Sequence, residues 1–282
     1  MIITRTPFRV SFFGGGTDLP DWFKTHGGAV LSTTINKYLF ISCRQMPPYF
    51  GIKNRFVYGS NSELVNTIDE IDHPAIRETL RFMKLPYGID MHYNTDIPAR
   101  SGMGSSSAFT VGLLRALYGL QGKMIADRRL AGEAIYVEQD MIKEAVGCQD
   151  QIAAAFGGFN HIVFKDNGSF EINPMTLPKK RIQELNDHLV LVFTGIQRIA
   201  SKIESEKIKQ LGSHKQELSD IARYVDDAID ILNNDKPIEE FGSLLNETWI
   251  RKMKLSQSVS DERINALYET GRKNGAIGGK LL

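Results

Sequence analysis

Apolar, β-branched and aromatic residues gather in short runs that predict strands. Met1–Phe13 is such a run, and Gly14-Gly15-Gly16 ends it. Ala29–Arg44 has the same character and predicts two strands, with Asn36-Lys37 as the turn between them. Three further strands are predicted at Gly88–Thr95, Phe159–Phe164 and Leu189–Thr194.

Apolar residues at roughly helical spacing predict helices elsewhere in the chain. Asn61–Lys84 shows this spacing, while Ala108–Leu120 is apolar throughout and predicts a buried helix. Within the buried helix, Gly112 indicates a closely packed face. Further helices are predicted at Asp18–Thr25, at Leu130–Glu144 (which Gly147 ends), at Asp150–Phe156, at Ser201–Ile231 and at Ile238–Met253.

A polar link with a proline predicts a domain boundary near Asn173–Arg181, which divides the chain into residues 1–175 and 176–282. No internal repeat or low-complexity tract is visible. The last residues, Gly275–Leu282, resemble a glycine turn that leads into a strand. We therefore expect that further residues follow Leu282 in the whole protein.

Composition excludes several classes of partner. With 34 basic and 33 acidic residues, the formal charge is +1, so no overall field attracts nucleic acid or an acidic membrane. Any anion must be captured locally.

Cys43 and Cys148 are the two cysteines and form no CxxC pair, so we expect neither a disulfide framework nor a structural zinc site. No apolar run approaches the roughly 20 residues of a membrane span, and no leader is visible. We expect a cytoplasmic protein with a small-molecule substrate, and we leave a homodimer open.

The stretch Pro98-Ala-Arg-Ser-Gly-Met-Gly-Ser-Ser-Ser-Ala108 is the most informative in the chain. Its glycines let a backbone approach a bulky anion, and the helix that follows adds N–H groups and the positive end of its dipole. No Gly-Lys-Ser/Thr follows, so this is not a Walker A loop. A flexible turn before a buried helix is the alternative. The candidate phosphate-binding residues are Pro98, Ser101, Gly102, Met103, Gly104, Ser105, Ser106 and Ser107.

In this stretch the sequence resembles the GHMP kinases, the superfamily of galactokinase, homoserine kinase and mevalonate kinase. Their second motif reads Pro-x-x-x-Gly-Leu-Gly-Ser-Ser-Ala, which Pro98–Ala108 matches with Met103 in the Leu place. Thr6–Asp18 stands where the first motif is expected, and Gly275–Leu282 looks like the opening of the third. The resemblance implies ATP and Mg²⁺ as cofactors. It also implies an α+β fold with an N-terminal ribosomal-protein-S5-like domain and an incomplete, ferredoxin-like C-terminal domain.

Two acidic residues and one arginine are candidates for the chemistry. Phosphoryl transfer needs a carboxylate on Mg²⁺ and often another that accepts the hydroxyl proton. Resemblance to the galactokinase branch implies that Glu138 and Ser106 hold the metal and that Asp150 is the base. Arg9, at the basic position of the first motif, would stabilise charge near the acceptor. The alternatives are an exposed helical Glu138, an Asp150 that caps a helix, and a surface Arg9.

The loop Gly14–Asp18 suits a close approach to a polar ligand. Galactokinase-like enzymes carry Glu-His where this chain has Gly15-Gly16, which argues against galactose. The glycine-rich version resembles the D-glycero-D-manno-heptose 7-phosphate kinases, and it implies transfer to the anomeric hydroxyl of a sugar phosphate. The candidate substrate residues are Gly15, Gly16, Thr17, Asp18 and Gln149.

Other functions stay open at this point. They are a fucokinase-like or galactokinase-like enzyme, an isoprenoid or amino-acid kinase, and a catalytically silent sensor that binds sugar and ATP. The sequence does not choose the residue that would hold a substrate phosphate. The basic candidates for that role are Lys37, Arg44, Lys53, Arg55 and Arg198, and Arg100 is an open candidate for the nucleotide phosphates.

Overall fold

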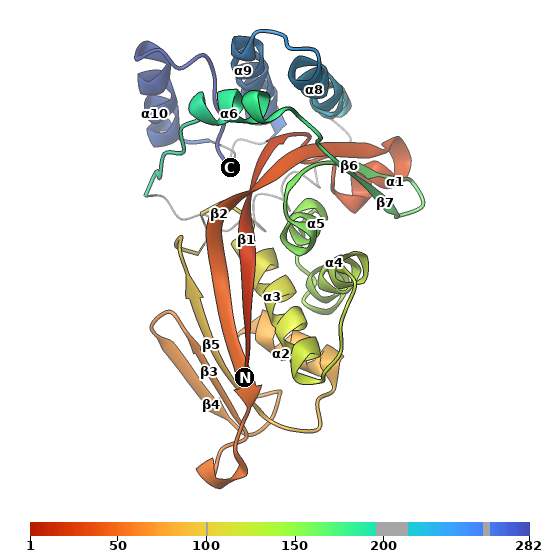
Figure 1. Ribbon diagram of the computed structural model, residues 1–282, viewed down its shortest axis with the longest axis vertical. Helices are drawn as coiled ribbons and strands as arrows, with labels where there is room; N and C mark the ends of the chain where they lie inside the picture. Colours follow the sequence, from red (N-terminus) through yellow and green to blue (C-terminus); the bar gives the residue numbers. More distant parts are fainter. Residues whose placement is uncertain (100, 196–213, 256–259) are drawn as a thin grey trace. The chain divides into compact units, whose positions relative to one another are not determined.

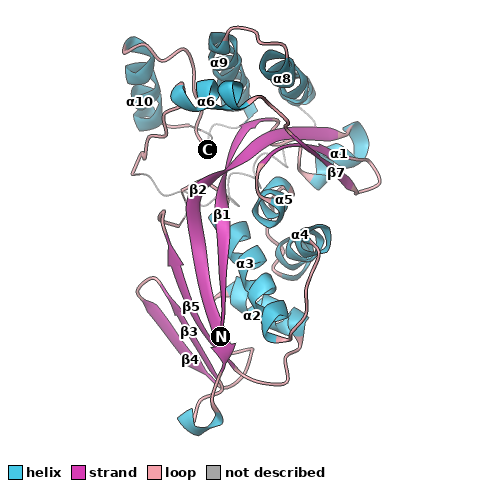
Figure 2. Cartoon of the chain, viewed as in Figure 1, coloured by secondary structure: helices cyan, strands magenta, loops and turns pink. Residues whose placement is uncertain are grey.

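The computed structural model describes residues 1–99, 101–195, 214–255 and 260–282. Strands and helices are mixed along the chain, which confirms the predicted α+β class (Figures 1 and 2). The strands are β1 Ile2–Phe13, β2 Gly28–Gln45, β3 Asn54–Tyr58, β4 Asn61–Val65, β5 Ile89–Thr95, β6 Phe159–Phe164 and β7 Phe170–Pro174. The helices are α1 Pro20–His26, α2 Pro74–Met83, α3 Ser105–Leu120, α4 Asp127–Tyr136, α5 Gln149–Phe156, α6 Lys179–Asp187, α8 Lys215–Asn233, α9 Ile238–Leu255 and α10 Glu262–Lys273.

The described chain forms two compact units that are discontinuous in sequence. The first unit comprises residues 1–9, 34–144 and 150–157, and the second comprises residues 10–33, 145–149 and 158–282. Strands β1 and β2 each contribute residues to both units. The division at residues 175 and 176 follows the order of the chain and stays a prediction.

In the first unit, a sheet carries the helices α2 and α3. Residues 39–45 of β2 pair antiparallel with β5, β5 pairs parallel with β3, and β3 pairs antiparallel with β4. Helix α3 packs closely on the strands at Gly112, where an added Cβ would lie 2.7 Å from Thr6 Oγ1. The predicted closely packed face of this helix is confirmed.

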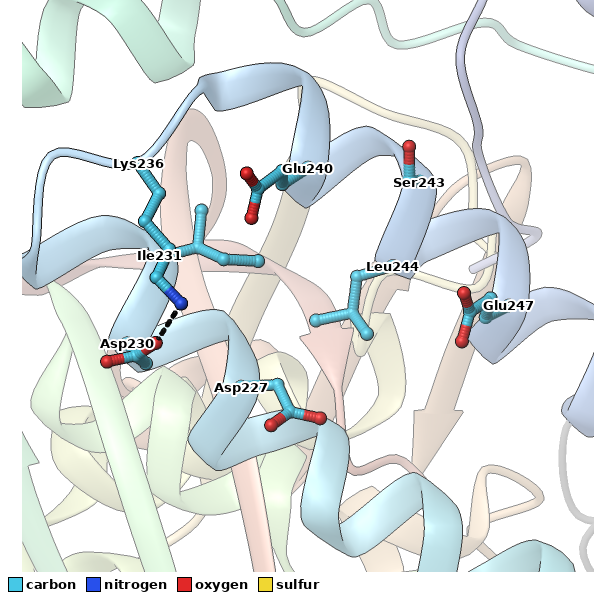
Figure 3. A pocket seen from close by; sticks show the side chains of 8 residues that line it. All are labelled: Asp227, Asp230, Ile231, Lys236, Glu240, Ser243, Leu244 and Glu247. Carbon is cyan, nitrogen blue, oxygen red and sulfur yellow. Dashed lines mark ion pairs between the residues drawn. The ribbon is translucent and has the colours of Figure 1, made fainter.

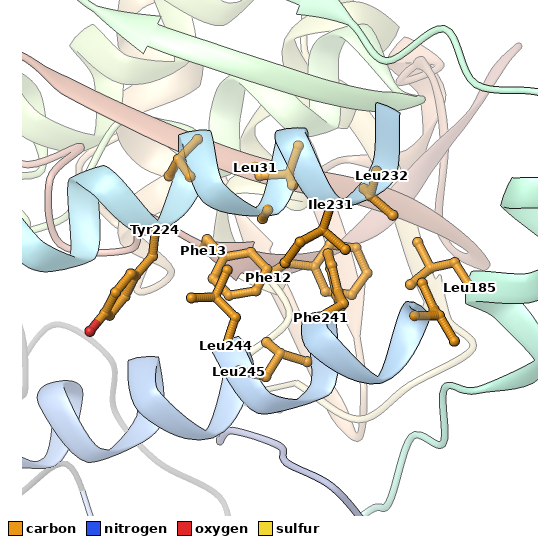
Figure 4. Packing of buried hydrophobic residues seen from close by; sticks show 13 residues of the cluster. Phe12, Phe13, Leu31, Leu185, Tyr224, Ile231, Leu232, Phe241, Leu244 and Leu245 are labelled. Carbon is orange, nitrogen blue, oxygen red and sulfur yellow. The ribbon is translucent and has the colours of Figure 1, made fainter. Parts of the chain in front are cut away.

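In the second unit, strand residues meet two long helices in an apolar core. Residues 28–33 of β2 pair antiparallel with β6, which pairs antiparallel with β7. Phe12, Phe13 and Leu31 from the strands share this core with Phe241 from α9 and Ile231 from α8 (Figure 4). The rings of Phe12 and Phe13 both contact the ring of Phe241 edge-on. This core fixes the end of β1. The loop Gly14–Asp18, which follows β1, holds candidate substrate residues.

Two sequence predictions about the N-terminal half are wrong. Ala29–Arg44 is one continuous strand within β2, because one part of it pairs with β6 and the other with β5. Asn61–Lys84 is not one helix, because its start pairs with β3 as strand β4 and α2 begins only at Pro74. Proline at the first helical position favours a helix start there.

Predictions in the C-terminal half have mixed outcomes. Leu189–Thr194 forms no strand, and its apolar side chains from Val190 to Phe193 are exposed. Gly275–Leu282 forms no strand either. The helix predicted at Leu130–Glu144 begins at Asp127 and changes at Val137 into a π-helical turn that ends at Met141. Of the helix predicted at 201–231, residues 201–213 lie outside the described residues, and α8 covers the rest.

The remaining predicted elements are confirmed to within a few residues. They are β1, β5, β6, α1, α3, α5 and α9. Both cysteines are buried free thiols, as expected. Among the described helices, none is long and apolar enough to cross a membrane.

Candidate functional site

The glycine and serine loop leads directly into a buried helix, as the motif predicts. Gly102 and Gly104 have φ angles of +76° and +72°, in the left-handed region that glycine adopts without strain. Gly104 caps helix α3, which begins at Ser105. The first turn of a helix directs N–H groups and the positive end of the dipole outward. This end of α3 adjoins the loop, which is an arrangement that suits an anion.

Arg9 on β1 and Asp150 in the first turn of α5 form a two-pronged ion pair. Arg9 Nε donates to Asp150 Oδ1 at 2.7 Å, and Nη2 donates to Oδ2 at 2.8 Å. The third nitrogen, Nη1, donates to the carbonyl oxygen of Gly102 at 2.8 Å. The side chains are 11% and 25% exposed, so the Asp150 carboxylate is held in one orientation and still reaches solvent.

The same loop lies against this ion pair. An added Cβ on Gly104 would be 3.2 Å from Asp150 Oδ2 and 3.3 Å from Arg9 Cγ. The backbone nitrogen of Arg9 also donates to the carbonyl oxygen of Met103 at 3.3 Å. The structure therefore brings together Arg9, Asp150 and the glycine loop, which stand far apart in the sequence.

Glu138 is a buried carboxyl group beside helix α3. It lies in the π-helical turn after α4 and is 0% exposed. Its Oε2 accepts hydrogen bonds from Ser107 Oγ at 2.9 Å and from Gln151 Nε2 at 2.6 Å. Its Oε1 has no hydrogen-bond partner among the described residues. Burial raises the pKa of this carboxyl group from 4.5 to about 7, although the nearby Thr110 hydroxyl and the hydrogen bonds from Ser107 and Gln151 oppose the rise.

These features of Glu138 fit a magnesium ligand. A buried carboxylate oxygen without a partner is costly unless something binds it, and Mg²⁺ is usually held by one or two carboxylates together with substrate phosphates. No group of three or more potential ligands from His, Cys, Asp or Glu occurs among the described residues. The hydroxyl bonded to Glu138 belongs to Ser107, while Ser106 is exposed.

In the second unit, the side chains of Thr17 and Asp18 hold their own loop. The Thr17 hydroxyl lies 2.8 Å from the carbonyl oxygen of Gly14 and 2.9 Å from that of Ala29. The Asp18 carboxylate accepts from the backbone nitrogens of Gly16 at 2.9 Å and Gln149 at 3.2 Å. Both residues are buried, at 0% and 3% exposure. The loop is thereby tied to the segment that precedes Asp150 in the chain.

The other predicted residues are placed as follows. Among the predicted phosphate-binding residues, Pro98 is exposed, Met103 is buried, and Ser101, Gly104 and Ser105 are partly exposed. Two of the basic candidates, Arg44 and Arg55, both donate to the buried Asp90 carboxylate, at 2.7 and 2.8 Å. Lys37 and Lys53 are exposed. Arg100 and Arg198 lie outside the described residues.

The sequence did not indicate two residues that hold other parts of the structure in place: Gln151, which bonds the Glu138 carboxylate, and Lys280, which bonds the end of β1. Gln151 bonds Glu138, and its place one residue after Asp150 on α5 was the available signal. Lys280 Nζ donates to the carbonyl oxygens of Ser11 at 2.6 Å and Phe12 at 3.1 Å. No local pattern links Lys280 to β1, because only the fold brings them together.

A hollow on helices α8 and α9 offers different chemistry (Figure 3). Four of its eight lining residues are acidic, and its one lysine, Lys236, pairs with Asp230 at 2.5 Å. Such a surface repels phosphate, so it is not the candidate site.

Comparisons with known proteins agree with this geometry. Residues 70–158, which contain the glycine and serine loop, Glu138 and Asp150, match the family model of the GHMP kinases N terminal domain. The chain is 29% identical over 99% of its length to D-glycero-alpha-D-manno-heptose 7-phosphate kinase of Campylobacter jejuni, of which it covers 85%. It is also 24% identical over 93% of its length to a bifunctional fucokinase/GDP-fucose pyrophosphorylase of Arabidopsis thaliana, of which it covers 27%.

Solved structures share the fold. A crystal structure of a D-glycero-D-manno-heptose 1-phosphate kinase from Bacteroides thetaiotaomicron matches with a TM-score of 0.80 and 23% identity, over 99% of this chain and 85% of that one. Residues 70–158 are therefore a GHMP kinase N-terminal domain, and the chain has the α+β fold of the GHMP kinases.

Proposed function

We propose that this protein transfers the γ-phosphoryl group of ATP to a sugar phosphate. The observation that carries the proposal is the Arg9–Asp150 pair, which lies against the glycine loop at the start of α3. Each Asp150 oxygen already accepts one Arg9 hydrogen bond and has a second lone pair for a substrate hydroxyl.

Each group in the first unit then has a role. Backbone amides of the loop and of the first turn of α3 bind the phosphates. Asp150 orients or deprotonates the acceptor hydroxyl, and Arg9 holds Asp150 and stabilises negative charge. Glu138 and Ser106 would hold Mg²⁺, with Ser107 and Gln151 fixing the Glu138 carboxylate. When bound, the metal ion neutralises charge on the transferring phosphoryl group.

For the acceptor, we propose the anomeric hydroxyl of D-glycero-D-manno-heptose 7-phosphate. The Campylobacter jejuni relative is named a kinase of this kind of sugar phosphate, and it aligns with nearly the whole chain. The glycines at positions 15 and 16 support the same choice, because they leave out the Glu-His pair of galactokinase-like enzymes. Thr17 and Asp18 then act by shaping the loop, and Gln149 is left as a side chain for the sugar.

An ADP-release assay tests this proposal. The acceptors are heptose 7-phosphate, fucose, galactose, mevalonate and homoserine, and we expect turnover with the heptose phosphate. Asp150→Asn should lower kcat by roughly 10²–10⁴-fold and leave ATP binding nearly unchanged. Asp166→Asn, at an exposed turn, is the matched control and should behave like the parent protein.

Other outcomes would redirect the assignment. Turnover with fucose or mevalonate alone would move the substrate to another branch of the family. Binding of ATP and sugar without any ADP release would favour the silent sensor. Near-normal turnover by Asp150→Asn would remove Asp150 as the base.

A further inference from the structure

Two arginines share one buried carboxylate on the sheet of the first unit. Asp90 on β5 is 3% exposed, and it lies directly opposite Arg44 on β2 and Arg55 on β3. Arg44 Nε donates to Asp90 Oδ2 at 2.7 Å. Arg55 donates through Nε to Oδ1 and through Nη2 to Oδ2, both at 2.8 Å. One negative charge therefore holds two positive charges in fixed orientations.

This cluster lies on the face of the sheet that helices α2 and α3 leave open (Figure 1). Side chains alternate between the two faces of a strand. Met91, the neighbour of Asp90, is buried, and Tyr93 contacts the ring of Phe109 on α3. Asp90 therefore points away from α3 and from the glycine and serine loop that leads into it. The two arginine side chains are 43% and 37% exposed, so both guanidinium groups reach solvent.

His92 extends the cluster along β5, and several of its N–H donors are unused. His92 stands two residues after Asp90 on the same face, with Nε2 3.4 Å from Asp90 Oδ1 and 3.5 Å from Arg55 Nη2. Among the described residues, Nη1 and Nη2 of Arg44 and Nη1 of Arg55 donate to no acceptor. Such guanidinium N–H groups match the oxygen atoms of a phosphate group.

A purely structural network of ion pairs is the alternative, and a second shared carboxylate in the chain shows the difference. Arg223 and Arg251 lie 3.8 and 3.4 Å from the Asp220 carboxylate. There the second positive charge is matched, because Arg223 also lies 4.0 Å from Asp227. At Asp90, no second carboxylate pairs with either arginine in the part of the chain that the structure describes. The surplus positive charge is unfavourable by itself and favours a bound anion.

We propose that Arg44, Arg55 and His92 form a binding site for a phosphate group, carried either by inorganic phosphate or by a phosphate monoester. The phosphate oxygens accept from the unused guanidinium N–H groups and from a ring N–H of His92. Asp90 lies beneath the site and holds the two arginines in position. This site goes beyond the proposed phosphoryl transfer and does not depend on it.

Nuclear magnetic resonance of the arginine side chains tests the proposal at the site itself. In protein labelled with ¹⁵N-arginine, the Nε–H resonances of Arg44 and Arg55 are assigned from the variants Arg44→Lys and Arg55→Lys. Both resonances should shift saturably as inorganic phosphate is added at constant ionic strength, whereas sodium chloride should cause no saturable shift. A parallel titration with glycerol 2-phosphate, a monoester, shows which source of the phosphate group binds more tightly.

Arg44→Gln tests the energetic contribution of the site. Asp90 keeps both hydrogen bonds from Arg55 in this variant, so no buried carboxylate is left unpaired. Binding of phosphate should weaken about 10-fold, as expected when charge-assisted hydrogen bonds are lost. Arg115→Gln is the matched control, because the Arg115 side chain is 42% exposed and pairs one-to-one with Asp127. It should bind phosphate as the parent protein does.

The glycine and serine loop also suits a phosphate, so its contribution is measured separately. Gly104→Ala should leave the phosphate-dependent shifts of Arg44 and Arg55 unchanged. The inference is overturned if phosphate shifts neither resonance in the parent protein, if chloride shifts them equally, or if Arg44→Gln binds phosphate as tightly as the parent. None of these results would affect the proposed kinase function, and a failed ADP-release assay would not affect this site.

Discussion

Replacing Glu138 by Gln should stabilise the metal-free protein at pH 8. The carboxyl group is fully buried, and its pKa is raised from 4.5 to about 7. This difference corresponds to about 3 kcal/mol against folding once both states are ionised. Gln is nearly isosteric and does not ionise. Its amide oxygen is able to accept the same bonds from Ser107 and Gln151.

The direction of the pH dependence follows from which state loses its proton first. Below about pH 4.5 the carboxyl group is protonated in both states, and ionisation makes no difference to stability. Between pH 4.5 and about 7 the unfolded chain loses the proton and the folded protein keeps it, so the parent protein becomes less stable as pH rises. Above about pH 7 the carboxyl group is ionised in both states, so its contribution to the free energy of unfolding no longer changes with pH.

Thermal unfolding followed by circular dichroism at pH 5, 6, 7 and 8 measures this effect. We expect Glu138→Gln to melt several degrees above the parent protein at pH 8, at roughly 2–4 °C per kcal/mol, and close to it at pH 5. Glu269→Gln, at an exposed position of α10, is the matched control and should show no such trend. Mg²⁺ with ATP should raise the melting temperature of the parent protein more than that of Glu138→Gln.

The reasoning is refuted if the stability of Glu138→Gln relative to the parent protein is no greater at pH 8 than at pH 5. In that case ionisation of Glu138 would not oppose folding. An unchanged response to Mg²⁺ with ATP would separately remove Glu138 as a metal ligand. Kinase activity should fall in the same variant, so gain of stability and loss of function would occur together.

Three further predictions test the packing around the site and in the second unit. Gly104→Ala places a Cβ 3.2 Å from Asp150 Oδ2 at a left-handed φ, so kcat should fall at least about 10-fold, with Gly132→Ala as the kinetic control. Arg9→Lys cannot reproduce the two-pronged bond to Asp150 and should lower kcat with little change in melting temperature; normal kcat would contradict the pairing. Gly278→Ala puts a Cβ 1.9 Å from the carbonyl oxygen of Gly242, so unfolding should cost about 1–3 kcal/mol less in denaturant titration, whereas Gly279→Ala should be nearly neutral.

Local sequence predicted those parts of the fold whose structure depends on nearest neighbours. The apolar run of α3 and the aromatic and β-branched residues of β6 were sufficient for their assignment. Local sequence failed where a distant partner decided the outcome. Asn61–Val65 has helix-compatible residues and becomes a strand because β3 lies beside it. Leu189–Thr194 has strand residues and forms no strand, because pairing, and not propensity alone, makes a strand.

For the site, the sequence by itself determined the kind of chemistry. Glycines followed by serines and an apolar helix can be recognised locally, because the required backbone freedom and helix start belong to adjacent residues. The resemblance then identified Arg9, Glu138 and Asp150 as the residues to examine.

Only the tertiary structure decided which atoms meet. It pairs Arg9 with Asp150 across 141 positions of sequence, buries Glu138 until its pKa rises, and bonds the Glu138 carboxylate to Ser107. It also shows Thr17 and Asp18 holding their own loop. Distances and desolvation arise from packing between distant segments, and no pattern of neighbouring residues records them.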